Sequence, residues 1–232
     1  MINKIVLSLD AAVAAVRDGS TIMIGGFGTA GMPSALVDAL IRQGARDLTV
    51  VGNNAGSAEI GLAALLKARR VRKIICSFPR QTDSYVFDGL YRAGDIELEL
   101  VPQGNLAERI RAAGAGIGAF FTPTGYGTPL AEGKETRSIH GRNYVLEYPI
   151  HADYALIKAD RGDRWGNLVY RKTARNFGPI MASAATCSIA EVREVVALGA
   201  LDPETIVTPG IFVQRVVAIH DEAVRAVPGA AA

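Results

Sequence analysis

Asp18-Gly-Ser-Thr-Ile-Met-Ile-Gly-Gly-Phe-Gly-Thr-Ala-Gly-Met-Pro33 is the stretch of this 232-residue sequence that decides the fold. Thr21 to Ile24 is an apolar, β-branched run without polar alternation, which is typical of a strand covered on both faces. Gly25 to Gly31 then breaks the strand, and Pro33 suits the first turn of a helix. Leu48 to Val51 is a second buried strand. Strand, turn, helix and strand in this order predict a βαβ unit and therefore a parallel sheet.

The same alternation continues on both sides of this unit. It predicts helices at Leu9 to Asp18, Ile60 to Ala68, Ser84 to Arg92, Leu106 to Ala113 and Ile180 to Ala190, and buried strands at Val71 to Ser77, Ile96 to Val101, Ala119 to Phe121 and Val192 to Ala197. From Lys134 to Arg171 the texture is β, which indicates a hairpin or a small insertion. No composition shift marks a linker. We expect one α/β domain over residues 1–227, a mainly parallel sheet flanked by helices, with a frayed tail at 228–232.

Composition and charge exclude several classes of function. The net charge of +2 is spread along the chain, so there is no electrostatic footprint for nucleic acid or for an anionic membrane. The charge-free windows Gly19–Val37 and Ala112–Ala131 hold too many glycines and prolines for a membrane-spanning helix. The two cysteines lack metal or disulfide spacing, and the three histidines are scattered. We therefore expect a cytoplasmic protein without a metal site.

Gly26-Phe-Gly-Thr-Ala-Gly31 is a literal GxGxxG between a predicted strand and helix, so a nucleotide-binding module is one hypothesis. A dinucleotide site also needs an acidic residue at the end of the next strand, to bind the ribose hydroxyls. That strand ends in Val51-Gly-Asn-Asn54 and has no carboxylate. The missing acid argues against NAD, and the nucleotide-binding module stays open as the alternative from a different class.

The wider segment resembles the signature of family I coenzyme A transferases, whose enzymes combine two kinds of subunit, A and B; the likeness is to the A kind. The shared positions are Asp18-Gly19, three apolar residues, Gly25-Gly-Phe27 and Gly31-Met-Pro33. Further matches lie at Asn53-Asn-Ala-Gly56, Pro102-Gln-Gly104, Phe121-Thr-Pro-Thr-Gly125, Gly162-Asp163, Gly166-Asn167 and Thr208-Pro-Gly-Ile-Phe-Val213. Arg80-Gln-Thr-Asp-Ser-Tyr-Val-Phe-Asp88 favours the branch that acts on 3-oxoadipate in aromatic-compound catabolism, the β-ketoadipate pathway. The corresponding subunit of an acetoacetate or short-chain fatty-acid transferase remains the alternative within the family.

The resemblance implies transfer of CoA from succinyl-CoA to a 3-oxoacid through a glutamyl-CoA thioester. CoA is then a substrate, and no permanently bound cofactor is expected. In the family the glutamate lies in a Glu-Asn-Gly motif of the B kind of subunit, and this chain has no such triplet. Glu59-Ile-Gly61 and Glu132-Gly133 are the nearest approximations, one opening a predicted helix and one in a loop. We therefore expect a hetero-oligomer in which the partner subunit carries the nucleophile.

Side-chain amides can stabilise a tetrahedral oxyanion without carrying charge. Asn53, Asn54 and Gln103 each follow a predicted buried strand, at the edge where open α/β sheets bind ligands. The same residues are also common in turns. The resemblance implies that they shape the acyl pocket, and that backbone amides of the glycine loop face CoA or the acyl group; the loop comprises Gly25, Gly26, Phe27, Gly28, Thr29, Ala30 and Gly31. Arg80 is the candidate for binding the distal carboxylate of the substrate, because a guanidinium matches a planar carboxylate.

Overall fold

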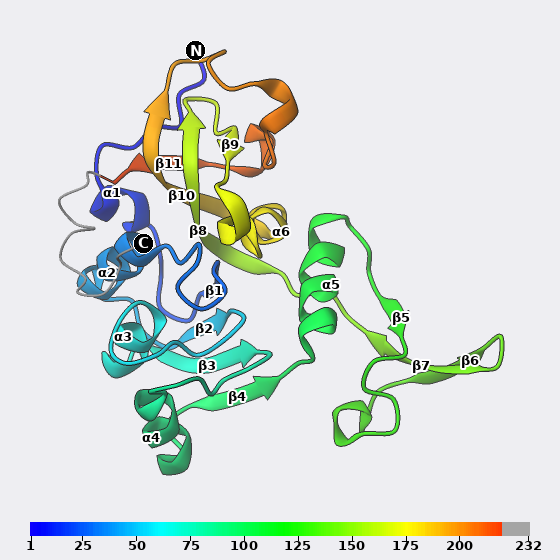
Figure 1. Ribbon diagram of the computed structural model, residues 1–232. Coiled ribbons are helices and arrows are strands. Elements are labelled where there is room, and N and C mark those ends of the chain that lie inside the picture. Colours follow the sequence, from blue (N-terminus) through cyan, green and yellow to red (C-terminus); the bar gives the residue numbers. More distant parts are fainter. Residues whose placement is uncertain (220–232) are drawn as a thin grey trace.

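The computed structural model describes residues 1–219, and a large sheet runs through the body of the molecule (Figure 1). Its strand order is β11-β10-β8-β1-β2-β3-β4, and all neighbours in this order pair in parallel. The strands are β1 Thr21–Ile24, β2 Leu48–Val51, β3 Val71–Cys76, β4 Glu97–Leu100, β8 Ala152–Asp163, β10 Ala185–Val196 and β11 Arg215–Ala218. The short strand β9, Leu168–Val169, pairs antiparallel to β8. The predicted α/β fold with a mainly parallel sheet is confirmed.

Helices cover both faces of this sheet, as the apolar strands predict. One face packs against α1 Leu9–Val13, α2 Ser34–Gln43, α3 Leu62–Lys67 and α4 Tyr85–Ala93, and the other against α5 Gln103–Gly114 and α6 Gly178–Ala184. The strand β1 shows the division, since Ile22 and Ile24 belong to the first core and Met23 to the second. All three side chains are buried, so hydrophobic burial holds each layer to the sheet.

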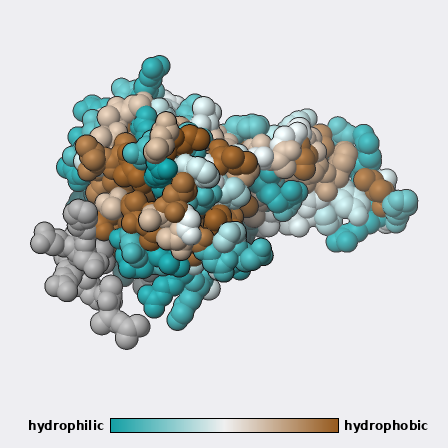
Figure 2. All heavy atoms as spheres, turned by 90° about the horizontal axis from the view of Figure 1, so that it is seen from above, coloured by the Kyte–Doolittle hydropathy of each residue, from teal (hydrophilic) through white to brown (hydrophobic). Residues whose placement is uncertain are grey.

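A small antiparallel sheet forms an arm that projects from the body (Figures 1 and 2). Its order is β5-β7-β6, with β5 Phe120–Thr122, β6 Thr136–Ile139 and β7 Arg142–Glu147. The β-rich segment expected from Lys134 to Arg171 therefore divides between this arm and the main sheet. Figure 2 shows hydrophobic residues gathered over the larger body.

The chain reverses direction in the sheet next to β1. From β1 it advances through β2 and β3 to the edge strand β4, and it then returns to place β8 on the other side of β1. Such a switch point leaves a crevice at the carboxyl ends of the strands, where ligands bind in open α/β folds. The glycine loop leaves β1 at this point, and its Gly25 N–H donates to the carbonyl of Leu156 in β8 at 3.0 Å.

Two predicted helices are wrong in part, and tertiary contacts explain both. The helix expected to reach Asp18 ends at Val13, because the carbonyls of Ala15 and Val16 accept hydrogen bonds from Tyr154 and Gln43. The helix expected at 180–190 ends at residue 184, and residues 185–190 pair with β8.

Two predicted strands also need correction. The strand expected at 119–121 is a half-buried strand of the arm, and β4 is an exposed sheet edge. The strand β6 lies within the segment expected to be β-rich, whereas β11 was not predicted. The expected tail at 228–232 lies outside the described residues.

Candidate functional site

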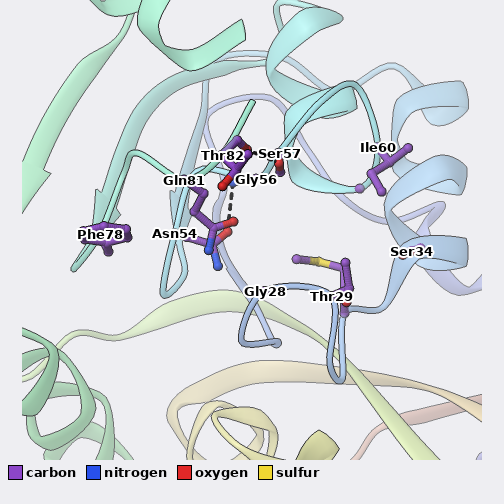
Figure 3. Close-up of a pocket in the computed structure, with 12 residues that line it drawn as sticks. Gly28, Thr29, Ser34, Asn54, Gly56, Ser57, Ile60, Phe78, Gln81 and Thr82 are labelled. Atoms are coloured by element: carbon purple, nitrogen blue, oxygen red, sulfur yellow. Dashed lines mark hydrogen bonds between the residues drawn. The ribbon is translucent and has the colours of Figure 1, made fainter. Parts of the chain in front are cut away.

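A cavity of about 470 Å³ lies at the carboxyl ends of β1, β2 and β3 (Figure 3). The loops that follow these three strands supply most of its wall, together with the starts of α2 and α3. Its lining residues are Gly28, Thr29, Met32, Ser34, Asn54, Gly56, Ser57, Ile60, Gly61, Phe78, Gln81 and Thr82. None of them is charged. The cavity therefore offers hydroxyl and amide groups beside apolar side chains, a lining that suits the uncharged part of a ligand.

The glycine loop uses most of its backbone amides within the protein. Phe27 and Ala30 exchange N–H···O hydrogen bonds at 3.0 and 3.2 Å, and Gly26 N–H donates to Asn176 Oδ1 at 3.2 Å. With the Gly25 bond to β8, only the amides of Gly28, Thr29 and Gly31 lack an acceptor among the described residues. We expected the whole loop to face a ligand, but within the loop only the Gly28–Thr29 turn lines the cavity.

Close packing against residues 172–176 fixes the end of the loop. A Cβ on Gly31 would lie 2.1 Å from the carbonyl oxygen of Ala174, and the φ of Gly31 is +73°. Asn176 completes the contact, because its Nδ2 donates to the Ala30 carbonyl at 2.9 Å. Asn176 was not among the site residues predicted from the sequence. Only the turn-forming Asn-Phe-Gly-Pro string marked it, and nothing in that string pointed to a loop 150 residues earlier.

Gly31→Ala should destabilise the protein much more than Gly28→Ala. Both positions have positive φ, +73° and +60°, so each alanine carries the left-handed cost of about 1–2 kcal/mol. A Cβ at position 31 would clash with the backbone of Ala174, whereas a Cβ at position 28 has no atom within 4 Å. We expect Gly31→Ala to lower the Tm by about 5–15 °C and Gly28→Ala by about 2–6 °C, measured in parallel thermal unfolding. Equal shifts would show that the close approach does not hold the loop.

The predicted amides separate into two groups at the same sheet edge. Asn54 lines the cavity, and its Oδ1 accepts from Gly56 N–H at 2.9 Å, so it also has the turn role that its sequence position allowed (Figure 3). Asn53 and Gln103 contact each other, with Gln103 Nε2 donating to Asn53 Oδ1 at 2.8 Å. Ser77, which the sequence analysis did not single out, donates to the same oxygen at 2.8 Å.

This cluster of Asn53, Ser77 and Gln103 fixes the direction of the Asn53 amide. Its Oδ1 accepts two hydrogen bonds, while its Nδ2 donates to no group among the described residues. Asn53 is buried and Gln103 is exposed. Gln103 follows β4 as predicted and begins α5, but β4 is an exposed edge strand instead of the buried strand that was expected. The cluster can present amide N–H donors to a developing oxyanion.

Arg80 lies outside the cavity lining. Its Nε donates to Asp88 Oδ1 of α4 at 2.8 Å, and its side chain is 58% exposed. The neighbouring Gln81 does line the cavity, and Ser84 holds it in place by accepting from Gln81 N–H and donating to its carbonyl. Of the two neighbours Arg80 and Gln81, only Gln81 lines the cavity.

The two glutamates that approximate the missing triplet do not line the cavity. Glu59 accepts a hydrogen bond from Lys67 in α3, and this bond lowers the pKa of the Glu59 carboxyl. Glu132 ends the short 3₁₀ helix Pro129–Ala131 in the arm. Cys76 is buried, as expected of a core residue, and burial raises the pKa of its thiol to about 12. The described residues that line the cavity thus supply neutral donors and no carboxylate.

No group of three or more His, Cys, Asp or Glu side chains in residues 1–219 is arranged to hold a metal ion. No helix in the same range is long and apolar enough to span a bilayer. His220, the last of the three scattered histidines, lies outside the described part of the chain.

Comparison with known proteins gives matches along almost the whole chain. Residues 6–218 match the family described as Coenzyme A transferase. The chain is 74% identical over 223 residues to the A subunit of 3-oxoadipate CoA-transferase from Pseudomonas putida, covering 96% of each protein. It is 65% identical over 228 residues to the protein of the same name from Acinetobacter baylyi, covering 98% of this chain and 100% of that one.

A solved structure shows the same fold at low sequence identity. Glutaconate coenzyme A-transferase from Acidaminococcus fermentans superposes with a TM-score of 0.84 at 22% identity. The match covers 95% of this chain and 77% of the other.

Proposed function

Because the chain belongs to the coenzyme A transferase family, we propose that it is the A subunit of a 3-oxoadipate CoA-transferase. The observation that carries this proposal is the 74% identity to a protein of that name over nearly the full length of both chains. The enzyme transfers CoA from succinyl-CoA to 3-oxoadipate and releases succinate. We assign it to the cytoplasm, which agrees with the unpaired cysteines Cys76 and Cys187.

The proposed chemistry divides between this chain and a partner subunit of the B kind. A glutamate on the partner attacks the succinyl thioester, forms an acyl anhydride and releases the CoA thiolate. The thiolate attacks the glutamyl carbonyl, which gives a glutamyl-CoA thioester and succinate, and the same steps in reverse order load the acceptor. Each step passes through a tetrahedral intermediate with a negatively charged oxygen. Neutral N–H and O–H donors stabilise this oxyanion by hydrogen bonding and stay unchanged from step to step. Asn53, Asn54 and Gln103 fill this role in the proposal, and CoA is a substrate that leaves.

Exposed apolar side chains near the cavity support the docking of the partner subunit on this face. Phe78 is 60% exposed and Ile60 is 49% exposed, although both line the cavity. Large apolar groups in solvent at a site's rim are typical of surfaces that another chain covers. With the partner in place, the cavity would be closed from water on the side where the glutamate enters.

The acceptor separates this proposal from its alternative within the family. We expect the assembled enzyme to use 3-oxoadipate with a kcat/KM about 10- to 150-fold above that for acetoacetate, since one carboxylate contact contributes about 1.5–3 kcal/mol. Steady-state kinetics with succinyl-CoA and each acceptor measure this. Equal or greater efficiency with acetoacetate would identify the chain as part of an acetoacetate-type transferase instead.

Arg80→Ala in the same assay tests whether Arg80 binds the distal carboxylate of the substrate. The two Nη groups of Arg80 make no ion pair among the described residues, so they are available to a carboxylate beside the cavity. If Arg80 binds the distal carboxylate, the variant loses efficiency with 3-oxoadipate and keeps any residual acetoacetate reaction. An equal fractional loss with both acceptors would show that Arg80 does not read that charge.

A further inference from the structure

A carboxylate is buried beneath the start of α2, the helix that follows the glycine loop. Glu191 lies in β10, its side chain has no solvent exposure, and its Oε2 accepts from Leu36 N–H at 3.0 Å. Lys158, its direct neighbour across the β8–β10 pairing, places Nζ 3.4 Å from Oε1. Burial raises the pKa of Glu191 to about 6, with Lys158 and the Leu36 amide acting in the opposite direction.

Burying the Glu191 carboxylate lowers the stability of the fold, and packing alone does not explain why a glutamate occupies this position. An ionised carboxylate taken out of water is expensive, and an apolar residue of similar volume in a buried strand is often as stable or more so. The free N–H groups at the start of a helix compensate part of the cost, since they need acceptors. Oε1 makes no hydrogen bond among the described residues. Glu191 was detectable in the sequence only as a single charge within the run Ile189-Ala-Glu-Val192.

The amide that Glu191 holds lies just behind the wall of the cavity, two residues after Ser34. Leu36 is the third residue of α2, and Met32 and Ser34 just before it line the cavity. These residues connect directly to the Gly28–Thr29 turn. Two side chains therefore hold this segment. Asn176 bonds Gly26 and Ala30 of the glycine loop, and Glu191 bonds the start of α2, which follows the loop.

We propose that Glu191 is a positioning residue, which fixes Met32, Ser34 and the Gly28–Thr29 turn against the substrate by accepting the Leu36 N–H. The expected effect of Glu191 on the reaction rate rests on the proposed transferase function. Its expected effect on the position of the loop rests only on the hydrogen bond to Leu36. Displacement of a cavity wall by about 1 Å lowers the rate by up to about 100-fold.

The test compares Glu191→Met with Glu191→Gln in the enzyme assembled with its partner. The two side chains have the same length, but only glutamine keeps an oxygen that can accept the Leu36 N–H. We expect Glu191→Met to lower kcat/KM by about 10- to 100-fold at a temperature well below its Tm. Glu191→Gln should stay within about threefold of the parent.

Hydrogen exchange of the backbone amides in residues 26–36 gives a second readout that needs no turnover. Exchange should be faster in Glu191→Met than in the parent and near parental in Glu191→Gln. If the parent enzyme shows no transferase activity, the proposed function fails while this measurement still decides the positioning role of Glu191. Parental exchange and parental kcat/KM in Glu191→Met would overturn the proposal. So would an equal impairment in both variants, or a lower Tm with unchanged kcat/KM.

Discussion

Purified alone, the chain should transfer no CoA from succinyl-CoA to 3-oxoadipate, and it should gain this activity when mixed with its partner subunit. The reaction needs a carboxylate that attacks a thioester, and the residues that line the cavity are all uncharged. No Glu-Asn-Gly triplet occurs in the sequence. Hydroxyl and amide donors stabilise an oxyanion, but they do not replace the nucleophile, so the expected difference in rate is essentially complete.

Three measurements check this expectation. Steady-state assays compare the chain alone, the chain with its partner, and the chain with a partner whose motif glutamate is changed to alanine. Intact-mass analysis after incubation with succinyl-CoA shows which of the two polypeptides gains CoA with loss of water. A CoA adduct on this chain, at Glu59 or Glu132, or sustained turnover free of the partner, would contradict the division of labour.

Much of the site could be predicted because it depends on local sequence. Apolar runs end in Gly25, Gly52 and Ser77, so strands β1, β2 and β3 and the loops after them are visible without a structure. Carboxyl ends of parallel strands meet at one edge, which predicts that the Asn53 and Gln103 segments converge although they are 50 residues apart. The 2.8 Å hydrogen bond between these two side chains confirms that convergence.

The supports of the site could not be predicted, because they depend on how the chain returns across the sheet. Asn176 reaches the glycine loop, and Glu191 reaches the start of α2, only after β8 pairs with β1 and β10 pairs with β8. At residues 185–190 local propensity even gave the wrong prediction. The alanine-containing stretch suggested a helix, whereas in the structure these residues form a strand that pairs with β8. The strand order, which no local pattern encodes, places both supports.

Gln103→Ala should lower kcat by about 10² to 10³ while leaving assembly and Tm nearly unchanged. Gln103 is exposed, so its truncation removes little buried surface. Its Nε2 bonds Asn53 Oδ1 with one hydrogen and keeps a second, and that bond also fixes which end of the Asn53 amide carries the free Nδ2 donor. The variant therefore removes one donor and loosens another, both of which act on charge that develops only in the transition state.

Two further variants separate donation from shape at this position. Gln103→Glu keeps the size of the side chain but replaces the donor with a carboxylate, which would face Asn53 Oδ1, so we expect a loss at least as large as in Gln103→Ala. Ser77→Ala removes the other donor to the same oxygen, together with its 3.0 Å contact to the Asn53 backbone carbonyl. It should cost about tenfold in kcat, because Gln103 still orients the Asn53 amide. A Gln103→Ala enzyme that assembles normally and turns over at the parental rate would exclude the oxyanion role. A loss expressed entirely in KM would instead assign Gln103 to substrate binding, since a group that stabilises only the transition state lowers kcat.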